Sequence, residues 1–253
     1  MNSNAQSSDD LRSAKPLTHA QVFEYNQPLT LKHGGQLPHV QVTYETYGTL
    51  NASRSNAIML CHALSGDSHV AQHDPTDDPG WWDLAVGPGK IIDTNEYFVI
   101  CSNVLGGCRG TTGPNSINPQ TNQPYGQDFP IVTIEDMVDV QKLLVEHLGI
   151  EKLFAVIGGS LGGMQTLCWA TRYPDSLHAA GVLASAPRLS AQGIAFDVVA
   201  RNAILRDPHF HNGQYYDKAY KPDVGLALAR MLGHITYLSP KAMHDKFERD
   251  KLA

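Results

Sequence analysis

The chain has 253 residues, of which 42% are hydrophobic and 17% are charged. This balance excludes an intrinsically disordered chain, and the length suggests one or two domains with a sizeable core. The net charge of −6 argues against a nucleic-acid or anionic-membrane partner. No apolar run approaches the roughly 20 residues of a membrane span, so we expect no membrane segment.

Residues 1–18 are polar, so we expect a mobile tail that lacks the apolar core of an export signal. The cysteines are Cys61, Cys101, Cys108 and Cys168, and none of them forms a Cys-x-x-Cys pair. All but Cys108 lie in apolar segments, which is typical of buried reduced thiols. The cysteine pattern therefore predicts a cytoplasmic protein.

The first half of the chain is rich in predicted strands. Residues 29–32 and 40–47 alternate apolar with polar side chains, as half-buried strands do. Residues 56–62 and 97–102 are nearly continuous apolar runs, which is typical of central parallel strands. The glycine-rich loop at 106–114 does not fit a phosphate-binding P-loop, and we expect it near the active site.

In the second half, predicted helices and strands alternate as far as Pro187, after which only helices are predicted. We therefore expect a core over residues 19–187, with a mostly parallel, doubly wound sheet, and the start of a helical cap over residues 188–253. The predicted helices cover 134–148, 164–172, 191–206, 224–232 and 240–249, and the predicted strands cover 152–157 and 179–186.

Gly158-x-Ser160-x-Gly162 lies between a predicted strand and a predicted helix. This is the context of a nucleophile elbow, a sharp turn that exposes a serine hydroxyl above the sheet of an α/β-hydrolase fold. Ser160 is therefore the candidate nucleophile, and the backbone N–H of Leu161 is a candidate oxyanion donor. A glycine-rich turn that binds phosphate or only packs is the alternative.

The loop that follows the strand at 56–62 is where this fold places its second oxyanion N–H, and Leu64 is the candidate donor. The same region is rich in possible metal ligands, which offers a competing interpretation. Their spacing places them in a loop rich in Pro and Gly and not on one helix face, so we expect no metal. These possible ligands are His62, Asp67, His69, His73, Asp74, Asp77 and Asp78.

Several separated motifs resemble the homoserine O-acyltransferases, and the resemblance runs from about Leu29 to the last residues. It rests on the segments 61–66, 80–83, 106–114, 158–165, 184–192 and 229–239. It implies an enzyme of methionine biosynthesis that moves an acyl group from succinyl-CoA or acetyl-CoA to the γ-hydroxyl of L-homoserine. It also implies a Ser160 acyl-enzyme, no cofactor beyond the acyl-CoA co-substrate, and a cap-mediated homodimer.

The resemblance implies that Arg230 and Tyr237 contact the substrate, with the Arg230 guanidinium on the homoserine carboxylate. A solvated helix salt bridge is the alternative for Arg230. The stretch 207–213 resembles the branch that uses succinyl-CoA, which favours that donor. An esterase or thioesterase with the same elbow is the competing function.

One departure from the family pattern concerns the catalytic Asp and His, which the family carries after the cap at the ends of two further strands. The sequence provides no residue at matching positions, so we assign neither. We expect that the chain is an N-terminal part without the final strands, and that these 253 residues alone are inactive.

Overall fold

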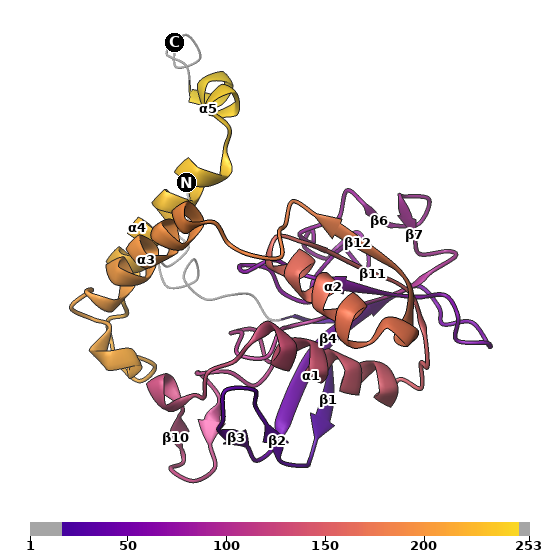
Figure 1. Ribbon diagram of the computed structural model, residues 1–253, viewed down its shortest axis with the longest axis horizontal. Helices are drawn as coiled ribbons and strands as arrows, with labels where there is room; N and C mark the ends of the chain where they lie inside the picture. Colours follow the sequence, from indigo (N-terminus) through magenta and orange to yellow (C-terminus); the bar gives the residue numbers. More distant parts are fainter. Residues whose placement is uncertain (1–16, 248–253) are drawn as a thin grey trace, which may run out of the picture.

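The computed structural model describes residues 17–247, and a six-stranded sheet lies at its centre (Figure 1). Strand β4 is antiparallel to both of its neighbours, whereas the other neighbouring strands are parallel. The predicted mostly parallel sheet is thus confirmed. In spatial order the strands are β1 (Gln21–Tyr25), β4 (Val40–Tyr47), β8 (Phe98–Ser102), β5 (Ala57–Cys61), β11 (Leu153–Gly159) and β12 (Leu177–Leu183).

Three pairs of short strands lie outside this sheet. The predicted strand at 29–32 is shorter in the structure and forms one half of such a pair. Strand β1 was not predicted, because only Phe23 of its five residues is buried and its pattern is weak. The pairs are β2 (Leu29–Thr30) with β3 (Gln36–Leu37), β6 (Val86–Gly87) with β7 (Ile92–Asp93), and β9 (Ile117–Asn118) with β10 (Gln123–Pro124).

The predicted helices all form, with shifted ends. Helix α2 begins at Leu161, earlier than the sequence pattern predicted, and α4 continues to Tyr237. The helices are α1 (Ile134–His147), α2 (Leu161–Arg172), α3 (Ala191–Leu205), α4 (Asp223–Tyr237) and α5 (Pro240–Phe247). Short 3-10 turns lie at η1 (Gly126–Asp128), η2 (Pro174–Ser176) and η3 (His211–Gly213).

Helix α1 illustrates how the sequence sets the bounds of an element. The Thr133 hydroxyl accepts a hydrogen bond from the Asp136 N–H, and the Asp136 carboxylate accepts one from the Thr133 N–H, which forms a capping box. Gly149 follows the helix with a φ of 69°, a left-handed conformation that glycine adopts without strain. Between these caps, Val138, Leu144 and other apolar side chains are buried.

The two faces of the sheet are covered differently. On β5, Met59 and Cys61 belong to the core under α1 and α2, which includes the fully buried Trp169. Ile58 and Leu60 point the other way, into a second core formed with the loop that contains β6 and β7. Alternate residues of one buried strand thus supply both cores, as its continuous apolar run predicts.

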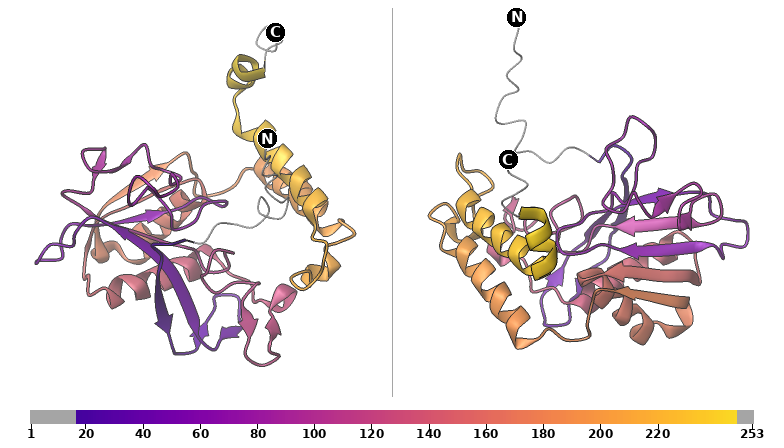
Figure 2. Two further views of the ribbon diagram at one scale, coloured as in Figure 1. Left: turned by 180° about the vertical axis from the view of Figure 1, so that it is seen from behind. Right: turned by 90° about the horizontal axis from the view of Figure 1, so that it is seen from above.

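Helices α3 and α4 lie side by side and stand away from the sheet (Figure 2). They approach closely at Gly225, where an added Cβ would overlap the Ala203 carbonyl of α3. The Gly225 N–H donates to the carboxylate of Asp207, just after α3, at 2.7 Å. Described residues between 188 and 247 form helices and no strand, in keeping with the expected cap, and the division at residue 187 stays a prediction. Most of the expected tail, residues 1–16, and the last part of the expected cap, 248–253, lie outside the described residues.

Candidate active site

Ser160 occupies the single residue between β11 and α2, and its side chain is exposed. Its φ of 55° and ψ of −119° place it in a region that non-glycine residues rarely adopt. Two hydrogen bonds hold this conformation, because the Ser160 N–H donates to the Leu183 carbonyl at 3.0 Å and its carbonyl accepts from Ser185 Oγ at 2.7 Å. Strain of this kind typically costs about 1–3 kcal/mol and clusters at functional sites.

The two glycines that flank Ser160 are required by space. A Cβ atom on Gly158 would overlap the Gly162 carbonyl, and one on Gly162 would overlap the Cys61 carbonyl at the end of β5. Strand, turn and helix therefore pack more closely than any larger residue allows. This close packing is what the predicted elbow requires.

Both candidate oxyanion donors lie at the edge of the sheet where β5 and β11 end. Leu161 is the first residue of α2, so its N–H has no acceptor within the helix. Leu64 follows β5, which pairs in parallel with β11 so that Cys61 faces Gly158, and its side chain is 73% exposed. Among the described residues no backbone hydrogen bond uses the Leu64 N–H.

A buried polar network links the loop after β5 to α1 and α2. The Gln165 amide donates to the His62 carbonyl at 3.3 Å and accepts from Gln141 at 2.7 Å. Gln141 in turn accepts from the Trp169 ring N–H at 2.8 Å. Because each amide has a specific partner, the network fixes the position of the loop after β5 relative to α2, the helix that begins after Ser160.

The His62 ring is part of the scaffold. Its Nε2 accepts from the Val104 N–H at 3.2 Å, and its Nδ1 lies 2.7 Å from the Ala63 carbonyl, to which it donates. These contacts define a neutral ring, and burial lowers the pKa of His62 accordingly. His62 is therefore not a free ligand or base.

Across residues 17–247, no hydrogen bond joins the Ser160 hydroxyl to a histidine or carboxylate. His178 lies within β12, which begins two residues before the predicted strand at 179–186, and it is at the end of β12 remote from Ser160. The described part of the chain thus holds the candidate nucleophile and the two candidate N–H groups, and none of its histidines or carboxylates contacts the serine hydroxyl as an activating base would.

Arg230 and Tyr237 both lie on α4, and both are exposed, Tyr237 to 82%. No hydrogen bond or ion pair among the described residues joins either of them to the elbow. Helix α4 packs against α3, on the side of the molecule away from the sheet (Figure 1). Their predicted role at the substrate therefore stays a prediction.

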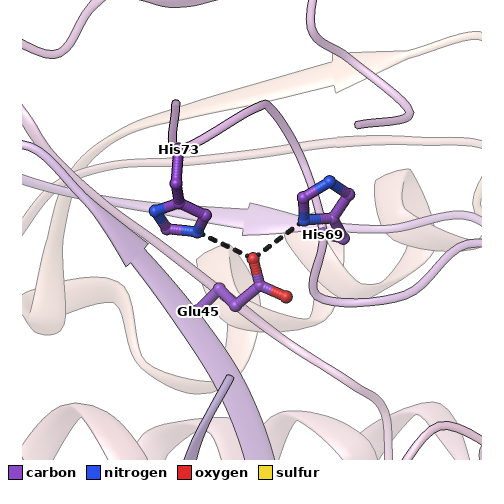
Figure 3. Close-up of side chains that lie close together, drawn as sticks. All are labelled: Glu45, His69 and His73. Carbon is purple, nitrogen blue, oxygen red and sulfur yellow. Dashed lines mark hydrogen bonds and ion pairs between the residues drawn. The ribbon is translucent and has the colours of Figure 1, made fainter. Parts of the chain in front are cut away.

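The structure brings together a group that sequence analysis missed, Glu45 with His69 and His73 (Figure 3). Glu45 is fully buried on β4, and its Oε2 lies 3.0 Å from His69 Nδ1 and 2.9 Å from His73 Nε2. Burial alone would raise the pKa of Glu45, but the hydrogen bonds from His69, His73 and Tyr47 lower it overall. Their donor atoms and this carboxylate form one compact polar cluster.

This cluster changes the set of residues that a metal could use. Of the possible ligands in the loop, His69 and His73 converge on Glu45, whereas both His62 nitrogens have other partners. A carboxylate and two imidazoles are ligand types that zinc accepts. The sequence did contain one signal for Glu45, because a charged residue among the apolar positions of the strand at 40–47 indicates a buried polar contact.

The chain matches the family model described as alpha/beta hydrolase fold over residues 56–249. It belongs to the alpha/beta hydrolase family. The match covers the elbow, the loop after β5 and the helices that follow the sheet, so the predicted fold class is confirmed.

Curated relatives carry homoserine acyltransferase names. A homoserine O-succinyltransferase of Alkalilimnicola ehrlichii is 59% identical over 230 residues, which are 90% of this chain and 60% of that protein. A homoserine O-acetyltransferase of Methanobrevibacter ruminantium is 56% identical over 90% of this chain and 47% of its own length. A bifunctional methionine biosynthesis protein MetXA/MetW of Rhodopirellula baltica is 55% identical over 99% of this chain and 40% of its own length. The chain spans about half the length of these relatives.

Solved structures point to two activities on one fold. The crystal structure of esterase E22 is 41% identical in sequence, with a TM-score of 0.82. The match covers 90% of this chain and 63% of the esterase chain. A homoserine O-acetyltransferase from Bacillus anthracis is 37% identical with a TM-score of 0.81, covering 91% and 63%. The resemblance that the sequence motifs predicted is confirmed by these relatives and neighbours.

Proposed function

We propose that these residues belong to a homoserine O-acyltransferase of methionine biosynthesis. The observation that carries the proposal is the strained, exposed Ser160 at the turn from β11 to α2. Its support is the similarity, at 56–59% identity, to proteins named homoserine O-acetyltransferase and homoserine O-succinyltransferase. The substrates are then L-homoserine and an acyl-CoA.

The reaction would proceed in two transfers. The Ser160 hydroxyl attacks the thioester carbonyl of the acyl-CoA, CoA leaves as the thiol, and the acyl group stays on Ser160 as an ester. The γ-hydroxyl of homoserine then attacks this ester and regenerates the serine. The N–H groups of Leu64 and Leu161 stabilise the oxyanion formed in each transfer.

Arg230 and Tyr237 complete the proposal as contacts to homoserine, with a charged hydrogen bond from the Arg230 guanidinium to the substrate carboxylate. Succinyl-CoA is the favoured donor, because residues 207–213 resemble the branch of the family that uses it, and acetyl-CoA is the alternative.

We further propose a cytoplasmic homodimer. None of the described helices is both long and apolar enough to cross a bilayer.

The test is CoA release by a full-length enzyme that contains these residues, with each acyl-CoA, in the presence and absence of homoserine. Turnover that requires homoserine is expected, together with an acyl adduct on Ser160 by mass spectrometry. The Ser160→Ala variant should lose both signals. Release of CoA at the same rate without homoserine would contradict the transferase.

An esterase is the second candidate, favoured by the 41% identity to esterase E22. Water would then take the place of the homoserine hydroxyl in the second transfer, and acceptor choice would depend on how well the pocket excludes water. Hydrolysis of a short-chain ester that homoserine does not slow would support this function.

A further inference from the structure

The Glu45 carboxylate collects hydrogen bonds from four side chains. Tyr47, His69 and His73 reach Oε2 at 2.9, 3.0 and 2.9 Å, and the Ser68 hydroxyl donates to Oε1 at 3.3 Å. Three of these four donors belong to residues 68–73, the segment that follows the loop with Leu64. One buried carboxylate on β4 therefore holds most of the polar side chains of this segment.

Tyr47 extends the same attachment to the backbone. Its hydroxyl accepts from the N–H groups of Val70 and Ala71, at 3.0 and 3.4 Å, so its own proton is directed to Glu45. Residues 68–73 are thus fixed to β4 through both side chains and main chain. Such a largely buried network favours one conformation, because loss of a bond to the buried Glu45 leaves a desolvated polar group.

The acceptors around His69 favour a hydrogen-bonded clamp over a bound cation. His69 Nε2 lies 2.7 Å from the Asp78 carbonyl while Nδ1 lies 3.0 Å from Glu45, so both ring nitrogens face acceptors and both carry protons. The resulting imidazolium balances the buried carboxylate. Tyr47 donates to the same carboxylate oxygen, so all contacts of Oε2 are accounted for by protein donors.

The clamp lies close to the oxyanion loop. Three residues separate Leu64 from Ser68, and the Ser68 N–H also donates to Asn103 at 3.1 Å. On its other side the loop leaves β5 at Cys61, against which Gly162 packs. The Leu64 N–H therefore lies on a short segment held at both ends, by the elbow and by the clamp.

We propose that Glu45 is a positioning residue of the acyl transfer, whose carboxylate holds residues 68–73 and so fixes the Leu64 N–H toward the oxyanion. This rests on the proposed function, in which Leu64 is an oxyanion donor. Loss of one oxyanion donor typically lowers kcat by about 100–1,000-fold. Displacement of the donor, with the loop still present, should lower it by about 10–100-fold.

The test compares Glu45→Gln with Leu64→Pro, which removes the N–H, and with the double variant in a full-length enzyme. Each single variant should slow CoA release from the acyl-CoA, with KM for the donor changed by less than about threefold, and the double variant should be no slower than the slower single one. Glu24→Gln, an exposed glutamate on β1, is the matched control and should keep the wild-type rate.

If Glu45→Gln does not fold, His73→Phe provides the second variant. The phenyl ring can keep the stacking on Tyr47, whose ring centroid lies 4.3 Å from that of His73, while the donor to Glu45 is lost. A loss of about three- to tenfold in the acylation rate is expected, and it should vanish in the Leu64→Pro background.

Two results would overturn the proposal. In the double variant, the rate losses caused by Glu45→Gln and Leu64→Pro could multiply, which would show that Glu45 does not act through the Leu64 N–H. The wild-type enzyme could also carry one equivalent of zinc whose removal by a chelator reproduces the loss, which would make the cluster a metal site. If Ser160 is acylated but homoserine is not used, the proposed acceptor fails and this inference stands.

Discussion

Arg230 is exposed on α4, so at the residue scale we expect its main contribution to come from the proposed contact with homoserine and not from the fold. The same holds for Tyr237, seven residues later on that helix. Exposed side chains can usually be exchanged with little effect on folding. A variant of Arg230 can therefore test the proposed contact to homoserine without a large change in the stability of the protein.

Replacing Arg230 with Leu should reduce kcat/KM for homoserine by about 10–100-fold, because a charged hydrogen bond to a carboxylate contributes about 1.5–3 kcal/mol. Acylation of Ser160 by the CoA donor should stay near the wild-type rate. Rapid-quench measurement of both half-reactions in a full-length enzyme checks this. An equal loss in both half-reactions would mean that Arg230 is structural.

At the scale of elements, the elbow depends on the contact between α2 and β5. Gly162, the second residue of α2, lies against the Cys61 carbonyl, and the buried network of Gln141 and Gln165 lies beside it. Close packing at Gly162 and the hydrogen bonds of Gln165 therefore both fix the N-terminal end of α2. A change at this contact would move Ser160 and the Leu161 N–H together.

Gly162→Ala should destabilise the protein by about 1–3 kcal/mol, because the added methyl group overlaps backbone that cannot move away. Gly193→Ala in α3 is the matched control, since an added Cβ there would lie 3.5 Å from the Ser190 hydroxyl, at ordinary contact distance. That control should be neutral or gain about 0.5–1 kcal/mol from helix propensity. Urea unfolding midpoints measure both, and equal midpoints would contradict the steric argument.

The sequence was sufficient for elements whose patterns are long and regular. Apolar runs predicted β5 and β8, and the apolar stripe that ends before Gly149 predicted α1 within a residue or two. Strand β1 was missed because one buried residue makes no pattern. Glu45 was missed for another reason, since its partners His69 and His73 are 24 and 28 residues away and only the fold brings them together.

At the scale of the whole molecule, the candidate nucleophile Ser160 follows the end of β11, whereas the proposed homoserine contacts belong to α4. Helices α3 and α4 stand away from the sheet (Figure 1). Among residues 17–247 no histidine or carboxylate reaches the Ser160 hydroxyl. Within these residues, the proposed mechanism therefore lacks a contact that would remove the serine proton.

The 253-residue chain, purified as a monodisperse species, should show no homoserine-dependent CoA release above the background. Loss of triad members in serine hydrolases lowers the rate by about four to six decades, and an unactivated serine is a poor nucleophile. Sustained turnover above a few per cent of the rate of a full-length relative would show that a base lies within these residues.

The left-handed backbone of Ser160 also sets stability against activity. Glycine adopts such angles freely, whereas serine and alanine both retain the steric conflict of a Cβ atom. Ser160→Gly should therefore be more stable than Ser160→Ala by about 1 kcal/mol in urea unfolding, although both lack the nucleophile. Equal stabilities would mean that the turn stores no strain. A serine at this turn therefore costs stability that a glycine would not, which is the balance expected if the proposed nucleophile is correct.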